Sequence, residues 1–249
     1  GREGEAGEGG REGRVDVGRP RAGEGGGEDG RAGGVGGVGF EARHHRAHIV
    51  VLSRGNVYPL VPPASPGADE RTAPAPAGEY AMSCLARERV VEFFSMRHGT
   101  PAVLVRLNYA VDLRYGVLVD VARKVWEEQP IDVTMGFANV IWQGDANRRI
   151  AASLALAASP PLVLNLTGLE TVSIRDAAER FGRRFGRRPH IVGREAPDAL
   201  LSDARRAAAL LGPPSVPLEL LLDWVGDWIA GGGALLGKAT HYEERSGTF

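Results

Sequence analysis

One tyrosine in this 249-residue sequence stands where a phenol could carry a proton: Tyr80, near the start of a predicted amphipathic helix. A phenol has an ordinary pKa of about 10, so it is a poor base at neutral pH unless a cation lies beside it. A residue four positions further along a helix lies on the same face, and a cation would belong there. Cys84 occupies that position. The sequence therefore predicts a proton-transfer group whose expected charged neighbour is replaced by a small, neutral side chain.

A second set of polar residues lies upstream, where a short apolar run over residues 48–53 ends. Ser53 offers a hydroxyl group, and Arg54 offers a positive charge. Because successive residues of a strand point to opposite faces, these two side chains cannot both point the same way. A Val57-Tyr58 pair and a loop with several prolines then lead to Tyr80.

This order of residues resembles that of the extended short-chain dehydrogenases, the NAD-dependent epimerases and dehydratases. In that family the tyrosine is the acid/base, a lysine four residues later lowers its pKa and holds the nicotinamide ribose, and a Ser/Thr positions the substrate oxygen. The resemblance implies catalytic roles for Tyr80 and Ser53, with Cys84 at the lysine position. Counted back from the Val-Tyr pair, the family's Ser/Thr position falls on Arg54. This leaves open whether the Ser53 hydroxyl or a compensating positive charge serves there.

The resemblance continues through most of residues 47–249. Asn108 looks like the residue at the mouth of the family's site, beside both nicotinamide and substrate, and Arg114 begins the substrate side. The resemblance thus implies that Tyr80 and Asn108 bind the cofactor and that Asn108 and Arg114 bind the substrate. It implies NAD or NADP as the cofactor and a nucleotide sugar as the small-molecule substrate. It also implies that the helix from Glu79 pairs in a homodimer.

Short apolar runs alternate with amphipathic stretches from residue 47 onward, a pattern typical of an α/β fold. We expect a partial Rossmann-type parallel sheet, made of late strands only, with a small C-terminal α/β substrate domain. Asp145 and Ser173 are expected to cap helices. The expected strands are 48–53, 102–107, 162–166 and 191–192, and the expected helices are 79–98, 117–128, 145–158, 173–186, 199–211 and 218–230.

Residues 1–46 are rich in Gly, Arg and Glu and show no helical or strand periodicity. We expect a disordered tail, because such a segment cannot bury enough surface to offset its ordering entropy; a region translated out of frame is the alternative. Residues 34–39 match G-x-G-x-x-G, but no strand precedes them, so we expect no phosphate loop there. His44, His45 and His48 lie at the edge of this tract, and we expect no metal site.

Composition limits the classes of partner. A formal net charge of −1 gives no concentrated basic field for nucleic acid or a membrane surface. No apolar run reaches the roughly 18 to 20 residues that span a bilayer. The one cysteine excludes a disulfide framework within the chain and fits a reducing compartment. We therefore expect a cytoplasmic protein with a small-molecule substrate.

Taken together, these residues predict an NAD(P)-dependent epimerase/dehydratase-like oxidoreductase that acts on a nucleotide sugar through Tyr80. The first strand found corresponds to a late Rossmann strand, so we expect the nucleotide-fingerprint half to be missing and the chain to be truncated, with weak or no activity. Residues 47–249 would then form the C-terminal part of such an enzyme. The alternative is a non-catalytic descendant that binds substrate or acts as a scaffold. The choice between NAD and NADP stays open.

Overall fold

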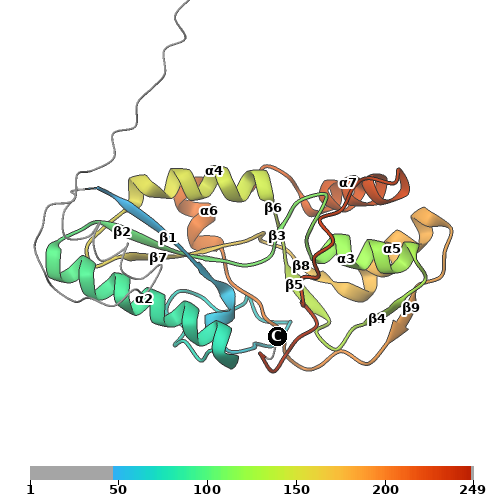
Figure 1. The fold of residues 1–249 in the computed structure, drawn as a ribbon, viewed down its shortest axis with the longest axis horizontal. Helices are drawn as coiled ribbons and strands as arrows, with labels where there is room; N and C mark the ends of the chain where they lie inside the picture. The colour runs from blue at the N-terminus through green and yellow to red at the C-terminus, as the bar shows by residue number, and fades with distance from the viewer. Residues whose placement is uncertain (1–46, 248–249) are drawn as a thin grey trace, which may run out of the picture. The chain divides into compact units, whose positions relative to one another are not determined.

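The computed structural model describes residues 47–247, and they form an α/β fold, as predicted (Figure 1). The elements, in chain order, are β1 (Ile49–Arg54), η1 (Gly55–Val57), α2 (Gly78–His98), β2 (Ala102–Leu107), β3 (Ala110–Val111), α3 (Val117–Trp126), β4 (Pro130–Asp132), β5 (Phe137–Asn139), β6 (Ile141–Trp142), α4 (Gln143–Ser153), η2 (Leu154–Leu156), β7 (Leu162–Leu166), β8 (Thr171–Ser173), α5 (Ile174–Phe185), β9 (His190–Val192), α6 (Arg205–Leu211) and α7 (Leu218–Ala230).

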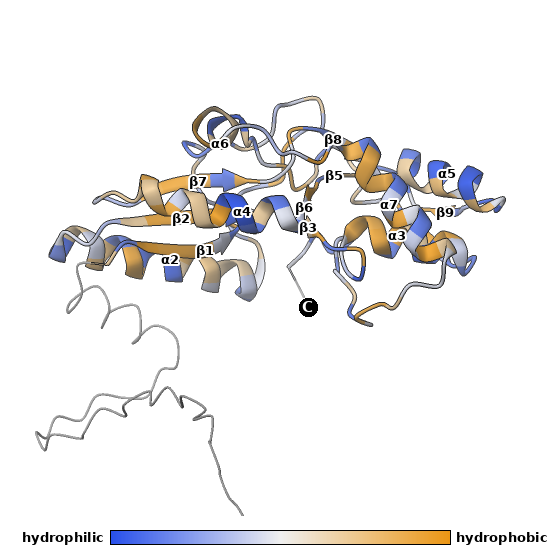
Figure 2. Cartoon of the chain, turned by 90° about the horizontal axis from the view of Figure 1, so that it is seen from above, coloured by the Kyte–Doolittle hydropathy of each residue, from blue (hydrophilic) through white to orange (hydrophobic). Residues whose placement is uncertain are grey.

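The main sheet has three parallel strands in the order β1-β2-β7, which confirms the predicted Rossmann-type sheet. The central strand β2 is buried at every position except its last, and this explains why its sequence is apolar at every position except Arg106. In Figure 2 these three strands are largely orange, the colour of hydrophobic residues. Among the described residues, β1 pairs with β2 alone.

Helices cover both faces of this sheet (Figure 1). On one face, Val91 of α2 packs against Val51 and Leu104. On the other face, residues of α4 and α6, among them Ile150 and Ala207, pack against the opposite side chains of the strands. Successive side chains of each strand therefore point into one helical layer and then the other, so a polar side chain of a strand must find its partners in one of these layers.

A second apolar core lies where α3, α5 and α7 meet, with two-stranded pairs β4-β9, β5-β8 and β3-β6 nearby. Its buried members include Val121, Phe181, Val225 and Tyr242. Ser173 caps α5 by accepting a hydrogen bond from the Asp176 amide, as predicted. This cluster forms the C-terminal α/β part of the chain.

Two expectations for the helices are wrong. Asp145 does not cap α4, which begins at Gln143; its carboxylate instead accepts hydrogen bonds from Ser215 and Val216, seventy residues away or more. The helix expected over 199–211 forms only as α6, because the backbone before it makes β-bridges to the loop after η1, through Ala199 and Ser202. Long-range hydrogen bonds override the local preference at both places.

The tail expected over residues 1–46, with the G-x-G-x-x-G match and two of the three histidines, lies outside the described residues. Among helices of the described part, none combines the length and apolar character needed to cross a membrane.

Candidate functional site

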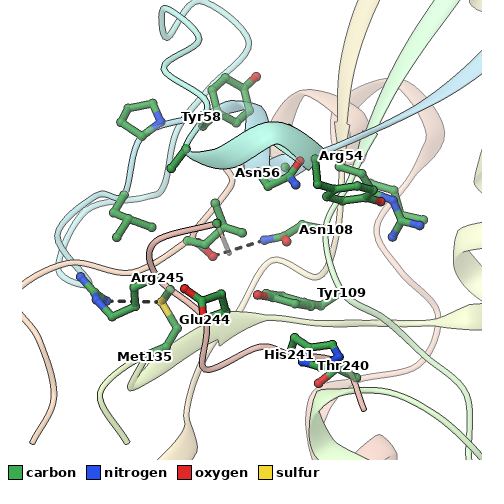
Figure 3. Close-up of a pocket in the computed structure, with 18 of the residues that line it drawn as sticks. Arg54, Asn56, Tyr58, Asn108, Tyr109, Met135, Thr240, His241, Glu244 and Arg245 are labelled. Atoms are coloured by element: carbon green, nitrogen blue, oxygen red, sulfur yellow. Dashed lines mark hydrogen bonds between the residues drawn. The ribbon is translucent and has the colours of Figure 1, made fainter. Parts of the chain in front are cut away.

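A pocket of about 380 Å³ opens at the carboxyl ends of β1 and β2 (Figure 3). Ligands of open parallel sheets bind at this end of the strands. Most of its wall comes from three parts of the chain: the turn η1 and the start of α2, the residues at and after the end of β2, and a C-terminal segment that we define as residues 240–247. Met135 and Leu200 also line it. A pocket of this size can hold a small organic ligand.

Tyr80 lies at this pocket, in the first turn of α2. Its side chain is 44% exposed, so its phenol can reach a bound molecule. The helix begins after Ala77, at the end of the proline-rich loop, and this fixes where the tyrosine stands. The structure thus places Tyr80 at the pocket wall, and its acid/base role stays a prediction.

Cys84 lies one helical turn further along and is buried, with 1% of its surface exposed. It packs in a small apolar cluster with Val57, Tyr58 and Ala68. The residue at the family's lysine position is therefore a neutral part of the core. It can supply no charge to the phenol of Tyr80 and no contact to a ribose.

Ser53 and Arg54 point to opposite faces, as their neighbouring positions on β1 require. The Ser53 side chain is fully buried, and its hydroxyl donates to Oε1 of Glu88 on α2 at 2.5 Å. It is outside the pocket lining. Arg54 is inside it and forms part of the wall (Figure 3). Of the two alternatives left open by the sequence, only the arginine reaches the pocket.

A buried polar network that the sequence analysis missed lies behind the pocket. Ser53, Arg106 and Asn165 are aligned across β1, β2 and β7 by the strand register. Arg106 donates to both carboxylate oxygens of Glu88, at 3.0 and 2.6 Å. Burial acts to lower the pKa of the arginine, but Glu88 outweighs it and raises that pKa. The available signal was an arginine and an asparagine inside apolar strands, since buried polar groups need partners.

Tyr58 joins this network through a hydrogen bond between its phenol and the guanidinium group of Arg106. Its oxygen accepts from Arg106 at 2.7 Å and donates to Asn165 at 2.9 Å. Only 2% of the residue is exposed. Burial raises the pKa of Tyr58 despite the nearby positive charge. This phenol is therefore held protonated in the core, which does not suit an acid/base.

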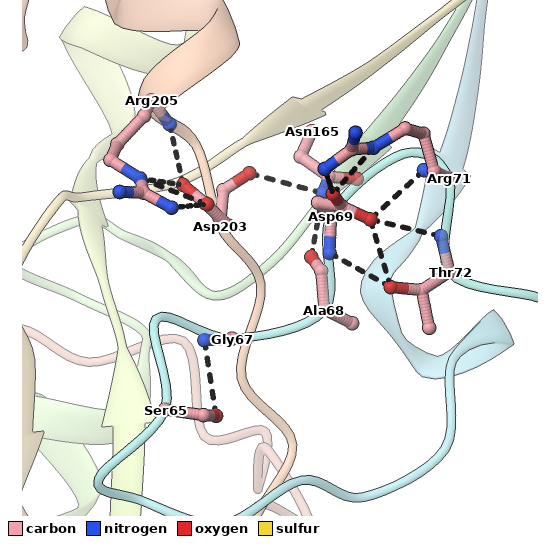
Figure 4. Close-up of polar contacts among 9 residues, drawn as sticks. All are labelled: Ser65, Gly67, Ala68, Asp69, Arg71, Thr72, Asn165, Asp203 and Arg205. Atoms are coloured by element: carbon pink, nitrogen blue, oxygen red, sulfur yellow. Dashed lines mark hydrogen bonds and ion pairs between the residues drawn. The ribbon is translucent and has the colours of Figure 1, made fainter.

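Asn165 links the network to the loop that follows η1 through hydrogen bonds (Figure 4). Its side-chain amide donates to the carbonyl oxygens of Ala68 and Asp203, at 2.9 and 3.1 Å. Asp69 organises the same loop by accepting from the Arg71 and Thr72 amides. The network thus fixes both the sheet and the loop that leads to Tyr80.

Asn108 lines the pocket directly after β2 and is 3% exposed. Its amide makes a long hydrogen bond of 3.4 Å to the Leu200 carbonyl. Gly55 packs so closely that an added Cβ would lie 3.1 Å from the Asn108 side chain. Arg114 lies outside the pocket lining, with its side chain 52% exposed and paired to Asp112 at 2.9 Å. The structure therefore brings Tyr80 and Asn108 together in one pocket, without Arg114.

The pocket wall also contains residues for which the sequence gave no role. The Oδ1 atom of Asn56 is buried without a hydrogen-bond partner among the described residues. Thr240, His241, Glu244 and Arg245 all come from the C-terminal segment, where the sequence analysis assigned no chemistry. Figure 3 shows these side chains at the pocket together with Asn108 and Tyr109, and Arg245 is directed at the sulfur of Met135. A chain end folding back onto the sheet leaves no local sequence signal.

No metal-ligating cluster of three His, Cys, Asp or Glu side chains occurs within residues 47–247. The polar side chains of the pocket instead carry hydroxyl, amide, imidazole and guanidinium groups, together with the carboxylate of Glu244. Such a set can bind the oxygen atoms of phosphates and sugars.

Comparisons with solved structures find the same fold in nucleotide-sugar enzymes. A UDP-glucuronic acid 4-epimerase variant from Bacillus cereus, solved with a fluorinated UDP-glucuronic acid and NAD, matches with a TM-score of 0.67 at 18% identity, covering 79% of this chain and 66% of that one. The UDP-glucose 4-epimerase of Thermus thermophilus, in complex with NAD, matches with a TM-score of 0.61 at 19% identity, covering 73% of this chain and 63% of that one. MoeE5 in complex with UDP-glucose and NAD matches with a TM-score of 0.63 at 20% identity, covering 78% and 69%.

This chain spans less than two thirds of the length of the first two of these structures. No protein-family model and no curated protein matches the sequence. The described residues therefore have the fold of UDP-sugar epimerases solved with NAD, which confirms the resemblance to the epimerase/dehydratase family at the level of the fold.

Proposed function

We propose that this chain binds a nucleotide sugar in the pocket at the ends of β1 and β2 and acts on it as an epimerase/dehydratase-like protein through Tyr80. The observation that carries the proposal is the shared pocket of Tyr80 and Asn108, predicted separately from the sequence and 28 positions apart. The similar structures were solved with UDP-glucose or UDP-glucuronic acid compounds, which supports a nucleotide sugar as the substrate class.

The role of Tyr80 is proton transfer. Its phenol would take a proton from a sugar hydroxyl, or return one, at the pocket wall. Without a cation at position 84 the phenolate is less stabilised. One missing charge-stabilising group costs on the order of 2 to 4 kcal/mol in the transition state, or roughly 10² to 10³ in rate. We therefore expect slow turnover.

The cofactor of the family, NAD or NADP, carries the hydride in such reactions, and the similar structures hold NAD. Position 84 does not fit the family's way of holding it, because Cys84 is neutral and lies inside an apolar cluster. Of the residues predicted to bind the cofactor, Tyr80 and Asn108 face the pocket. The proposal for NAD(P) rests on the resemblance and on these two residues.

A second candidate function is binding of a nucleotide sugar without catalysis. The burial of Cys84 favours it, since a neutral core side chain occupies the position of the family's lysine. Both candidates require the ligand to occupy the pocket. They differ in whether Tyr80 changes a reaction rate.

One experiment separates them. UDP-glucose is titrated into the protein by calorimetry, and its conversion in the presence of NAD is followed by chromatography. We expect micromolar binding by the parent and by Tyr80→Phe, and slow conversion by the parent alone. Arg89→Gln, on the exposed face of α2, is the matched control and should behave like the parent. Binding without conversion supports the second candidate, and no binding contradicts both.

We also propose a homodimer contact on α2. Met82, Phe93 and Met96 are each more than half exposed and recur along one face of this helix. Large apolar side chains gathered on a surface mark association sites. Light scattering should give twice the chain mass for the parent and the single mass for Phe93→Glu; a monomeric parent contradicts this contact.

A further inference from the structure

Backbone strain within the described residues gathers at the pocket. Three non-glycine residues of the described part have a positive φ: Tyr109 at 36°, Glu128 at 55° and His241 at 53°. Residues other than glycine rarely adopt this left-handed backbone conformation, because it costs them free energy. Tyr109 and His241 both line the pocket. Strained residues persist where their surroundings fix them, and they cluster at binding sites.

Glu128 has a local reason for its conformation. It follows α3 after one intervening residue, where the chain turns out of the helix, and its amide bonds back to the carbonyl of Val125. Its side chain pairs with Arg187 at the surface. His241 lies in a segment without helix or strand; its carbonyl accepts a hydrogen bond from the Glu244 amide at 3.1 Å, which closes the turn after it and does not fix its φ.

Contacts on both sides hold His241 in place. Asp120 on α3 accepts from the amide and the hydroxyl of Thr240, at 2.9 and 2.6 Å. Tyr242 follows and is buried in the core beside α3, with 1% exposed. Fixed residues before and after leave His241 one conformation, and that conformation puts it on the pocket wall (Figure 3).

We propose that His241 is a ligand-contacting residue of this pocket and that Asp120 positions it. The imidazole would donate a hydrogen bond to an oxygen of the nucleotide sugar, either of the diphosphate or of a sugar hydroxyl. The strain at His241 is then the cost of presenting this side chain to the ligand. The inference rests on the proposed function, because it needs a nucleotide sugar in the pocket.

The test compares binding with stability. In His241→Gly the side chain is lost and the strain is relieved, so the melting temperature should hold or rise by about 2 °C. Affinity for UDP-glucose should fall about tenfold, the scale of one hydrogen bond to a charged or polar group. His241→Asn, which tolerates the left-handed region, should lower affinity without a change in melting temperature. A purely structural role would lower stability and affinity together.

Glu128→Gly is the matched control, since it relieves similar strain outside the pocket. It should leave affinity unchanged. Titrating UDP alone separates the two oxygen sources: an equal loss for UDP and UDP-glucose assigns His241 to the diphosphate, and a loss for UDP-glucose alone assigns it to the sugar. Parent-like affinity in both His241 variants would overturn the inference. If the parent itself binds neither ligand, the proposed function fails and this inference fails with it.

Discussion

The buried network and the pocket at the ends of β1 and β2 differ in how their polar groups are satisfied. In the network, Ser53, Glu88, Arg106 and Tyr58 each have a hydrogen-bond partner inside the protein. At the pocket, Asn56 keeps a buried oxygen without a partner among the described residues, and two residues of the wall have strained backbone. The stretch of chain after Leu52 contributes to both regions, with Ser53 in the network, Asn56 at the pocket and Tyr58 in both.

This difference separates stability from binding. A fully paired buried network is costly to break, because removing one partner leaves the other uncompensated. An unpaired group and a strained residue cost stability and are retained where a ligand uses them. Substitutions in the buried network should therefore lower the free energy of unfolding, and substitutions at the pocket should lower ligand affinity.

The largest effect is expected for Arg106→Leu. It leaves the buried Glu88 carboxylate without its cation, and the free energy of unfolding should fall by about 3 to 5 kcal/mol in urea titrations. The double variant Glu88→Met/Arg106→Leu should recover part of this loss, because no charge is left buried. If single and double variants are equally destabilised, the network is not a charge-compensated unit.

Asp120→Ala should have the next largest effect, and it should lower both the stability of the fold and the affinity for the ligand. It removes both hydrogen bonds to Thr240, so stability should fall by about 1 to 3 kcal/mol. Since Asp120 positions the pocket wall, affinity for UDP-glucose should fall as well. Thr240→Ala keeps the amide bond and should lose less of both. A stable variant with parent-like affinity would show that the wall needs no anchor.

The stability that the buried Asp145 carboxylate contributes should depend on pH. Burial acts to raise its pKa, but hydrogen bonds from Ser215, Val216 and Arg148 outweigh this and lower it below the ordinary value of 3.8. A lowered folded pKa contributes stability that is present above the unfolded pKa and is lost as pH falls through the folded one. Asp145→Asn should thus be less stable by about 1 to 2 kcal/mol above pH 5, with the gap closing below about pH 4. A gap that is constant with pH contradicts this.

The smallest effect on stability is expected for Asn56→Ala. The buried oxygen has no partner to lose, so the free energy of unfolding should stay within about 0.5 kcal/mol of the parent. Affinity should nevertheless fall, as expected for a ligand contact. A large loss of stability would place Asn56 with the network instead.

The sequence predicted the longer elements well because their signals are local, and it missed the two- and three-residue strands β3, β4, β5, β6 and β8. The apolar runs of β2 and β7 were predicted with their observed bounds, and α7 likewise, from composition and period alone. Asp145 was misread because its partners lie near residue 215, which no local pattern reveals. The prediction for α6 was too long for the same reason, since the residues expected to form its first turns pair with a distant loop.

The candidate site was predicted in part. Tyr80 and Asn108 line the pocket because each stands at the end of an element with a clear signal, the start of α2 and the end of β2. Ser53 points into the network, and its direction depended on a one-residue difference in register that the sequence could not fix. The contribution of residues 240–247 depends on tertiary contacts with α3, so it became visible only in the fold.

The most direct test of the central claim, that this pocket is a nucleotide-sugar site, is hydrogen exchange with and without saturating UDP-glucose. The account predicts slower exchange in η1, at Asn108 and Tyr109, and across residues 240–247, with no change in β4 and β9. Protection confined to β4, β9 or α5, or no protection where calorimetry shows binding, would contradict it.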